Sequence, residues 1–295
     1  MKTKRLIWLA AAAVLHACCG GDDEGGSEPA AKYITVKADI GYMTRVVSDG
    51  ISSRFEDGDR LSLYVWTGLG IYRQDSMIVD GVVNTLAADG QWTPEVPMLW
   101  LDEWSPHYFL GISPARHVDS LHADAYRSLP TEDLLVARNM IGLQSYWGVV
   151  PLTFEHMLTR LDVNLRFRDE WDEVPTATQV TVRASDRCTV DYLTGQCSDL
   201  GDTATIVLPA VAAAVGHAQS FSGIIIPQDG VRTITVTVAG QEYTFTHFTD
   251  IRLQRGRYTT VNLTVGRSRI TLDGVTINDW RSGQSLDDVY AERVN

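Results

Sequence analysis

The chain has 295 residues, a formal net charge of −12 at pH 7 and a hydrophobic content of 44%. An acidic surface repels phosphate backbones, so the charge argues against nucleic acid as a partner. The length exceeds what one small hydrophobic core usually organises, so we expect two domains.

Residues 1–17 have the pattern of a secretory signal peptide, in which basic side chains precede the apolar run Leu6–Leu15. This run is too short to span a bilayer as a lone helix. It ends in Leu15-His16-Ala17, directly before Cys18. A branched apolar residue three positions before a cysteine is typical of bacterial lipoprotein signals. We therefore predict acylation of Cys18 and a lipid anchor in the membrane; plain secretion with cleavage nearby is the alternative.

Residues 18–32 are expected to form a flexible tether, because they are rich in Gly, Asp and Glu and contain little to bury. The acidic cluster Asp22-Asp23-Glu24 resembles the export tag that sends Bacteroidetes lipoproteins to the outer face of the outer membrane. A simple solvated linker is the alternative.

The first predicted strand lies within Tyr33–Arg45. Its apolar residues occupy alternate positions and so form one row on one face: Ile34, Val36, Ala38 and Ile40. A strand that is followed by an exposed basic residue can be detached by a trypsin-like protease, here by a cut between Arg45 and Val46. An ordinary first strand with an arginine in the next loop is the alternative.

The rest of the first domain, residues 33–155, reads as short strands separated by turn signals, with room for a short helix only at residues 117–127. The second domain, residues 156–295, is more plainly β. A turn is expected at Ala239-Gly240-Gln241, and Ile270–Trp280 is expected to supply the last two strands. Short strands at this spacing favour an all-β chain of two antiparallel β-sandwich domains.

Cys188 and Cys197 flank an eight-residue segment that reads as strand, turn and strand. Two cysteines that face each other across a hairpin in an oxidising compartment can form a disulfide. Two unlinked thiols on a loop remain the alternative.

Enzyme signatures are missing from the sequence: it has no Gly-x-Ser-x-Gly elbow, phosphate-binding glycine loop, Cys-x-x-Cys or His-Glu-x-x-His. His117 and His122 lie on no evident helix, so a shared metal is not expected. We predict no catalytic residues, no metal and no cofactor. The tryptophans between Trp66 and Trp104 can fill a sandwich core or stack on sugars, and a core role is favoured.

Taken together, these features resemble the fimbrillin-like (Mfa-like) lipoproteins of Bacteroidetes, the subunits of surface fimbriae. The landmarks of this resemblance are Ile34–Ile40, Thr44-Arg45, Phe55–Leu61, Trp92–Trp100, Tyr108–Pro114, Asp133–Ala137, Leu152–Leu158, Gly256–Tyr258, Ile277–Trp280 and Gly283.

The resemblance implies two tandem transthyretin-like domains, no catalysis, and a place in a fimbrium at the outer membrane. It also implies assembly by strand exchange: a trypsin-like protease cuts at Arg45, and a strand of a neighbouring fimbrial subunit fills the vacated groove. The polar tail Ser282–Asn295 is a poor donor strand, so the chain is either a tip or accessory subunit or donates Gly274–Trp280. The surface ligand of such an adhesin is not identified by the sequence. The alternative function is a glycan-binding lipoprotein of a nutrient-uptake system, with Trp100 or Trp104 in its sugar platform.

Overall fold

The computed structural model describes residues 32–41, 54–68 and 72–280. Nearly all of its regular structure is β-strand, and the two helices among these residues are single 3₁₀ turns, η1 (Gln74–Ser76) and η2 (Ser145–Trp147). The all-β prediction is therefore confirmed. In this described part, no helix is long and apolar enough to cross a membrane.

The first half of the chain forms one seven-stranded sheet. Its strands, in spatial order, are β1 (Thr35–Ile40), β8 (Val149–His156), β7 (Leu135–Leu143), β5 (His107–Ser113), β2 (Arg60–Thr67), β3 (Met77–Leu86) and β4 (Trp92–Pro94). The alternating apolar residues of these strands meet in one core cluster, which we call the first core; it includes Ile34, Leu63, Phe109 and Phe154.

The second half is a β-sandwich. One sheet contains β13 (Thr203–Leu208), β10 (Ala177–Ser185), β16 (Thr233–Val238) and β17 (Gln241–Thr246). The other contains β14 (Ala210–Val211), β15 (Gln219–Ile225), β9 (Thr159–Phe167), β18 (Arg257–Val265) and β19 (Ile270–Asp279). The second core lies between them. Ala239 and Gly240 have φ values of 50° and 77°, which is the geometry of the expected two-residue hairpin between β16 and β17.

A small third sheet connects the two halves. It consists of β12 (Gln196–Ser198), β11 (Arg187–Asp191) and β6 (Asp124–Arg127), and β6 comes from the first half of the chain. The prediction of a helix over residues 117–127 is wrong, because the end of this segment pairs with β11 instead. A partner more than 50 residues away overrides a weak local preference.

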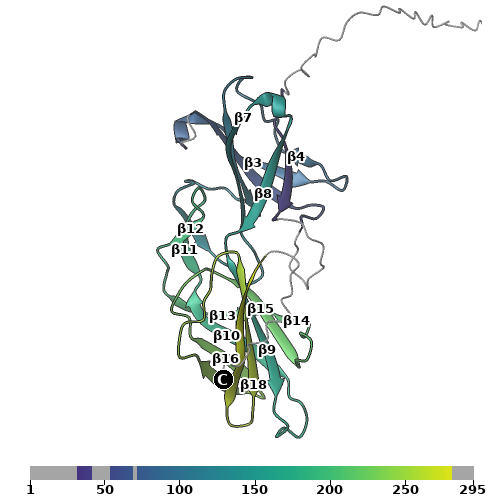
Figure 1. The fold of residues 1–295 in the computed structure, drawn as a ribbon, viewed down its shortest axis with the longest axis vertical. Helices are drawn as coiled ribbons and strands as arrows, with labels where there is room; N and C mark the ends of the chain where they lie inside the picture. The colour runs from purple at the N-terminus through teal and green to yellow at the C-terminus, as the bar shows by residue number, and fades with distance from the viewer. Residues whose placement is uncertain (1–31, 42–53, 69–71, 281–295) are drawn as a thin grey trace, which may run out of the picture.

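A third core also crosses the junction between the halves. Tyr64 and Trp66 of β2 pack there with Tyr192, Ile224 and other residues of the second half. Strand β2 is consequently buried on both faces, since its other side chains fill the first core. Figure 1 shows the two halves stacked along the long axis of the molecule, with β11 and β12 beside the junction.

The sheets are antiparallel apart from two parallel pairs, β1 with β8 and β9 with β18. The antiparallel expectation is wrong for these two pairs. About a hundred residues or more separate the two strands of each pair, and a connection of that length lets the chain return in the same direction. Strand β8 ends at His156 and β9 begins at Thr159, so the change of sheet falls near the expected domain boundary. Independent folding of residues 33–155 and 156–295, and a transthyretin-like topology for each, stay predictions.

The strand β19 covers Ile270–Asp279 and pairs with β18 along its whole length. The expectation of two strands in this segment is wrong. The strand runs on through Gly274, and the register irregularity is one extra residue on β19, Asp273, between the pairs Asn262–Gly274 and Leu263–Leu272. An irregularity of this kind bends a strand without ending it.

Candidate functional site

Strand β1 occupies an edge of the seven-stranded sheet, and its residues 35–40 pair in parallel with residues 149–154 of β8. The start of β1 also bonds to the segment after β4. Ile34 donates its backbone N–H to the carbonyl of Met98 at 2.9 Å, and Tyr33 forms an isolated antiparallel bridge with Leu99. At its start, β1 therefore lies between two stretches of backbone that its removal would leave unpaired.

The apolar row of β1 faces the first core, as the sequence predicts. Ile34, Val36 and Ile40 are 1%, 6% and 7% exposed, whereas Thr35 and Lys37 between them are exposed. Burying three side chains of this size contributes about 5–9 kcal/mol. That contribution is comparable to the whole stability of a typical domain, about 5–15 kcal/mol. Strand β1 thus fills a deep apolar groove, formed by the first core and the edge of β8, which we call the seat of β1.

The first core, against which β1 packs, is aromatic and closely packed around Phe154. The ring of Phe154 is fully buried, and the ring of Phe55 packs edge-on against it and against Trp92, each at 5.1 Å between centroids. A Cβ placed on Gly111 of β5 would lie 2.7 Å from the Phe154 ring. A larger residue at this position would have to displace the buried ring, and a glycine inside a strand often marks such a close approach.

Trp100 and His107 hold the beginning of β1. Trp100 is 7% exposed and donates its indole N–H to the carbonyl of Tyr33 at 3.2 Å. The His107 ring packs edge-on against Trp100 at 4.8 Å. The Nδ1–H of His107 donates to the Ser105 carbonyl at 2.7 Å, and Nε2 accepts from the Leu101 N–H at 3.1 Å. Burial lowers the pKa of His107, because the charged ring is poorly solvated there. The acceptor role of Nε2 likewise requires the neutral ring.

Sequence reasoning did not identify this contact. The sequence leaves Trp100 between a core role and a sugar platform, and the structure places it in the core. Trp66 and Trp92 are buried as well, whereas Trp104 is 79% exposed. Of the two tryptophans proposed for a sugar platform, only Trp104 is available at the surface.

Cys18, Arg45 and Val46 lie outside the described residues, and so does the tail from residue 281 onward. The described part of the first strand ends with Gly41, and the chain is next described from Arg54. Acylation of Cys18 and cleavage between Arg45 and Val46 therefore stay predictions.

Cys188 and Cys197 lie on the expected hairpin of β11 and β12 as free thiols. Val190 lies opposite Cys197, so Cys188, two residues earlier on the same face, is the diagonal neighbour of Cys197. A hydrogen bond from the Cys188 thiol to the Cys197 sulfur raises the pKa of Cys188, with burial adding to the effect. The same bond, assisted by the positive charge of Arg255, lowers the pKa of Cys197. The disulfide stays a prediction.

Among the described residues, no group of three or more His, Cys, Asp or Glu side chains is placed to hold a metal ion. His117 contacts Asp119 and His122 contacts Asp191, so the two histidines have different carboxylate neighbours at the surface.

Comparison with known proteins identifies a matching family model and similar folds. A family model described as fimbrillin-like matches residues 44–280. A solved structure of a candidate cell adhesion protein from Bacteroides ovatus has a TM-score of 0.66 at 15% identity, covering 85% of this chain and 99% of that one. Another, from Bacteroides uniformis, has a TM-score of 0.60 at 19% identity, covering 77% and 93%. No curated protein sequence matches the chain.

Proposed function

This chain belongs to the fimbrillin-like family, and we propose that it is a non-enzymatic fimbrial subunit or adhesin at the cell surface. In this proposal it joins its neighbours by strand exchange, with the seat of β1 as the acceptor groove. Its partners are other fimbrial subunits, a trypsin-like processing protease and, through acylated Cys18, the outer membrane.

The observation that carries the proposal is the combination of edge position and deep burial in β1. An edge strand can leave without breaking the order of the remaining sheet, because it has only one full-length partner. Its departure exposes apolar pockets at alternate positions and an unpaired edge of β8. Unpaired edges of this kind accept an extended strand, with backbone bonds supplying affinity and the pockets supplying register.

Retention of β1 until a protease acts keeps the precursor monomeric. The cleavage point proposed at Arg45 lies five residues beyond the end of β1 at Ile40. A cut there leaves β1 attached by noncovalent contacts alone. Those contacts are still strong, so we expect exchange to require an incoming strand of equal or better fit.

A donor role for β19 has weaker support. Its side chains are at best half-buried, and its row facing the second core comprises Ile270, Leu272 and Val275. Trp280, directly after β19, stacks on His156 at 4.1 Å between ring centroids and is 9% exposed. Withdrawing Gly274–Trp280 would therefore open the junction between the halves. We propose that the chain acts as an acceptor and that β19 stays in place.

Limited trypsin digestion of the purified precursor tests the acceptor role. We expect a preferential cut after Arg45, followed by oligomers in size-exclusion chromatography. The Arg45→Ala variant should block both, with Arg54→Ala as the matched control and the double variant to exclude a substitute cut at Arg54. A synthetic peptide of residues 32–45 should suppress the oligomers, whereas the same composition in scrambled order should not. Cleaved protein that stays monomeric in the presence of partner subunits would refute the acceptor role.

A further inference from the structure

A cavity of about 370 Å³ lies where the second half of the molecule meets the first, and no residue of β1 lines it. Its floor is the outer face of β9, β15 and β18. Its walls come from the segment Pro209–Ala214 and from the loop Pro130–Asp133 of the first half. This volume falls within the usual range for small-molecule sites, about 300–1,000 Å³.

The floor of the cavity is polar although little of it is exposed. The side chains of Leu161, Val163 and Leu165 in β9 fill the second core, so the alternate residues of β9 point the other way. Those alternate residues are Arg160, Asp162 and Asn164. On the neighbouring strand β15, Ser222 lies opposite Asp162 and Ser220 lies opposite Asn164.

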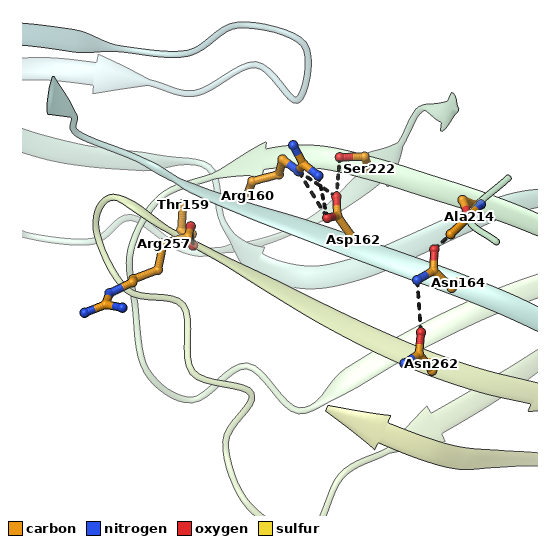
Figure 2. A network of polar contacts seen from close by, with 9 residues as sticks. Thr159, Arg160, Asp162, Asn164, Ala214, Ser222, Arg257 and Asn262 are labelled. Carbon is orange, nitrogen blue, oxygen red and sulfur yellow. Dashed lines mark hydrogen bonds and ion pairs between the residues drawn. The ribbon is translucent and has the colours of Figure 1, made fainter. Parts of the chain in front are cut away.

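Hydrogen bonds fix the orientation of these side chains, as Figure 2 shows for most of them. Arg160 donates from Nε to both oxygens of Asp162 at 2.8 and 3.1 Å, and from Nη2 at 2.8 Å. The Ser222 hydroxyl donates to the same carboxylate at 2.6 Å. Asn164 donates to the Asn262 amide oxygen at 2.9 Å and accepts from the Ser220 hydroxyl at 2.6 Å. The floor is therefore preorganised.

The ion pair on this floor is poorly solvated, because the side chains of Arg160 and Asp162 are only 18% and 14% exposed. A largely buried ion pair gains little stability over apolar side chains of the same size. The stability of the fold therefore does not explain why an ion pair, and not a pair of apolar side chains, occupies these two positions. The Nη1 group of Arg160 has no hydrogen-bond partner among the described residues and remains available to a ligand, as do acceptor lone pairs of Asp162 and Ser222.

The charges of the floor favour a neutral ligand. Arg160 is paired with Asp162, and the nearby loop contributes Asp133, whose carboxylate contacts His156, so no unpaired positive charge is present among the residues that line the cavity. The walls add apolar surface from Pro130 and Ile224. Paired donors and acceptors beside apolar patches match a molecule that carries several hydroxyl groups and hydrophobic C–H faces.

We propose that this cavity binds a neutral sugar residue of a glycan, with Arg160, Asp162, Asn164 and Ser222 as its polar contacts. As a receptor site it rests on the adhesin function proposed above, whereas the binding itself is a property of the isolated protein. The site differs from a tryptophan platform, since no tryptophan lines it.

The test uses the purified protein and a panel of neutral monosaccharides (glucose, galactose, mannose and N-acetylglucosamine), with glucuronic acid as the anionic comparison. Binding is followed by saturation-transfer NMR and by calorimetry. Ala212 lines the cavity and the adjacent Ala213 does not, and both are exposed. The pair Ala212→Trp and Ala213→Trp thus adds the same bulk inside and outside the site. Ser222→Ala removes one hydroxyl and leaves the ion pair intact.

We expect saturable binding of at least one neutral sugar, loss of binding in Ala212→Trp, and unchanged binding in Ala213→Trp. Ser222→Ala should weaken binding about three- to tenfold, the usual effect of one hydrogen bond. Absence of saturable binding across the panel overturns the proposal, as does equal binding in the two tryptophan variants or a preference for glucuronic acid. A protein that polymerises after cleavage yet binds no sugar refutes this site alone. One that binds sugar but does not polymerise refutes strand exchange alone.

Discussion

Replacing Ile34 by alanine tests how firmly β1 is held in its groove. The side chain is 1% exposed and packs in the first core, and its backbone N–H bonds to Met98. Truncation of a fully buried isoleucine removes burial and leaves a cavity, which together cost about 2–5 kcal/mol. We therefore expect the free energy of unfolding of the precursor to fall by this amount.

Urea unfolding followed by tryptophan fluorescence measures the change, with Lys37→Ala as the matched control. Lys37 lies on the same strand and faces solvent, so its truncation should change the stability by no more than about 0.5 kcal/mol. Hydrogen exchange at the β8 amides that face β1 adds a local measurement, and these amides should exchange faster in Ile34→Ala. If the two variants have equal stability and equal exchange, β1 is not held by its apolar row and the groove argument is wrong.

Three further outcomes are expected. Gly111→Ala should lower the free energy of unfolding by about 1–3 kcal/mol in urea titration, because its Cβ would press on the Phe154 ring. Iodoacetamide should alkylate Cys197 before Cys188, and at a lower pH than it alkylates an ordinary thiol, as measured by peptide mass spectrometry. Oxidation of the two thiols to a disulfide should raise the free energy of unfolding by about 2–3 kcal/mol. The depressed pKa of His107 should make the protein lose stability as the pH falls from about 7 to about 5, since the unfolded state then binds more protons; His107→Gln should reduce this loss.

The alternation of apolar residues in the sequence predicts β1 and its buried row correctly, because burial of one face is a local property of the strand. The partner of β1 is not predictable in this way. Nothing in residues 33–40 indicates that they will lie parallel to β8, more than a hundred residues later. The same limit explains the wrong helix at residues 117–127, where β6 pairs with β11 about 60 residues later.

The candidate site was predictable in part. The sequence indicates a detachable strand and a basic residue behind it, but it does not show that Trp100 and His107 hold the strand at its start. Both contacts depend on where a loop after β4 returns to the sheet. The sequence also indicates Trp100 as a candidate sugar contact, yet this side chain is buried in the core. The polar cavity is assembled from alternate residues of three strands, whose register cannot be read from the sequence alone.

The third core and the sheet of β6, β11 and β12 also determine how the subunit responds to bending. Side chains from both halves interdigitate in this core, and backbone hydrogen bonds cross the junction beside it. Two domains joined only by a linker pivot freely, whereas a shared core resists rotation because bending it would open cavities. A filament built from such subunits would therefore flex where one subunit meets the next, and each subunit would act as a stiff segment of fixed length.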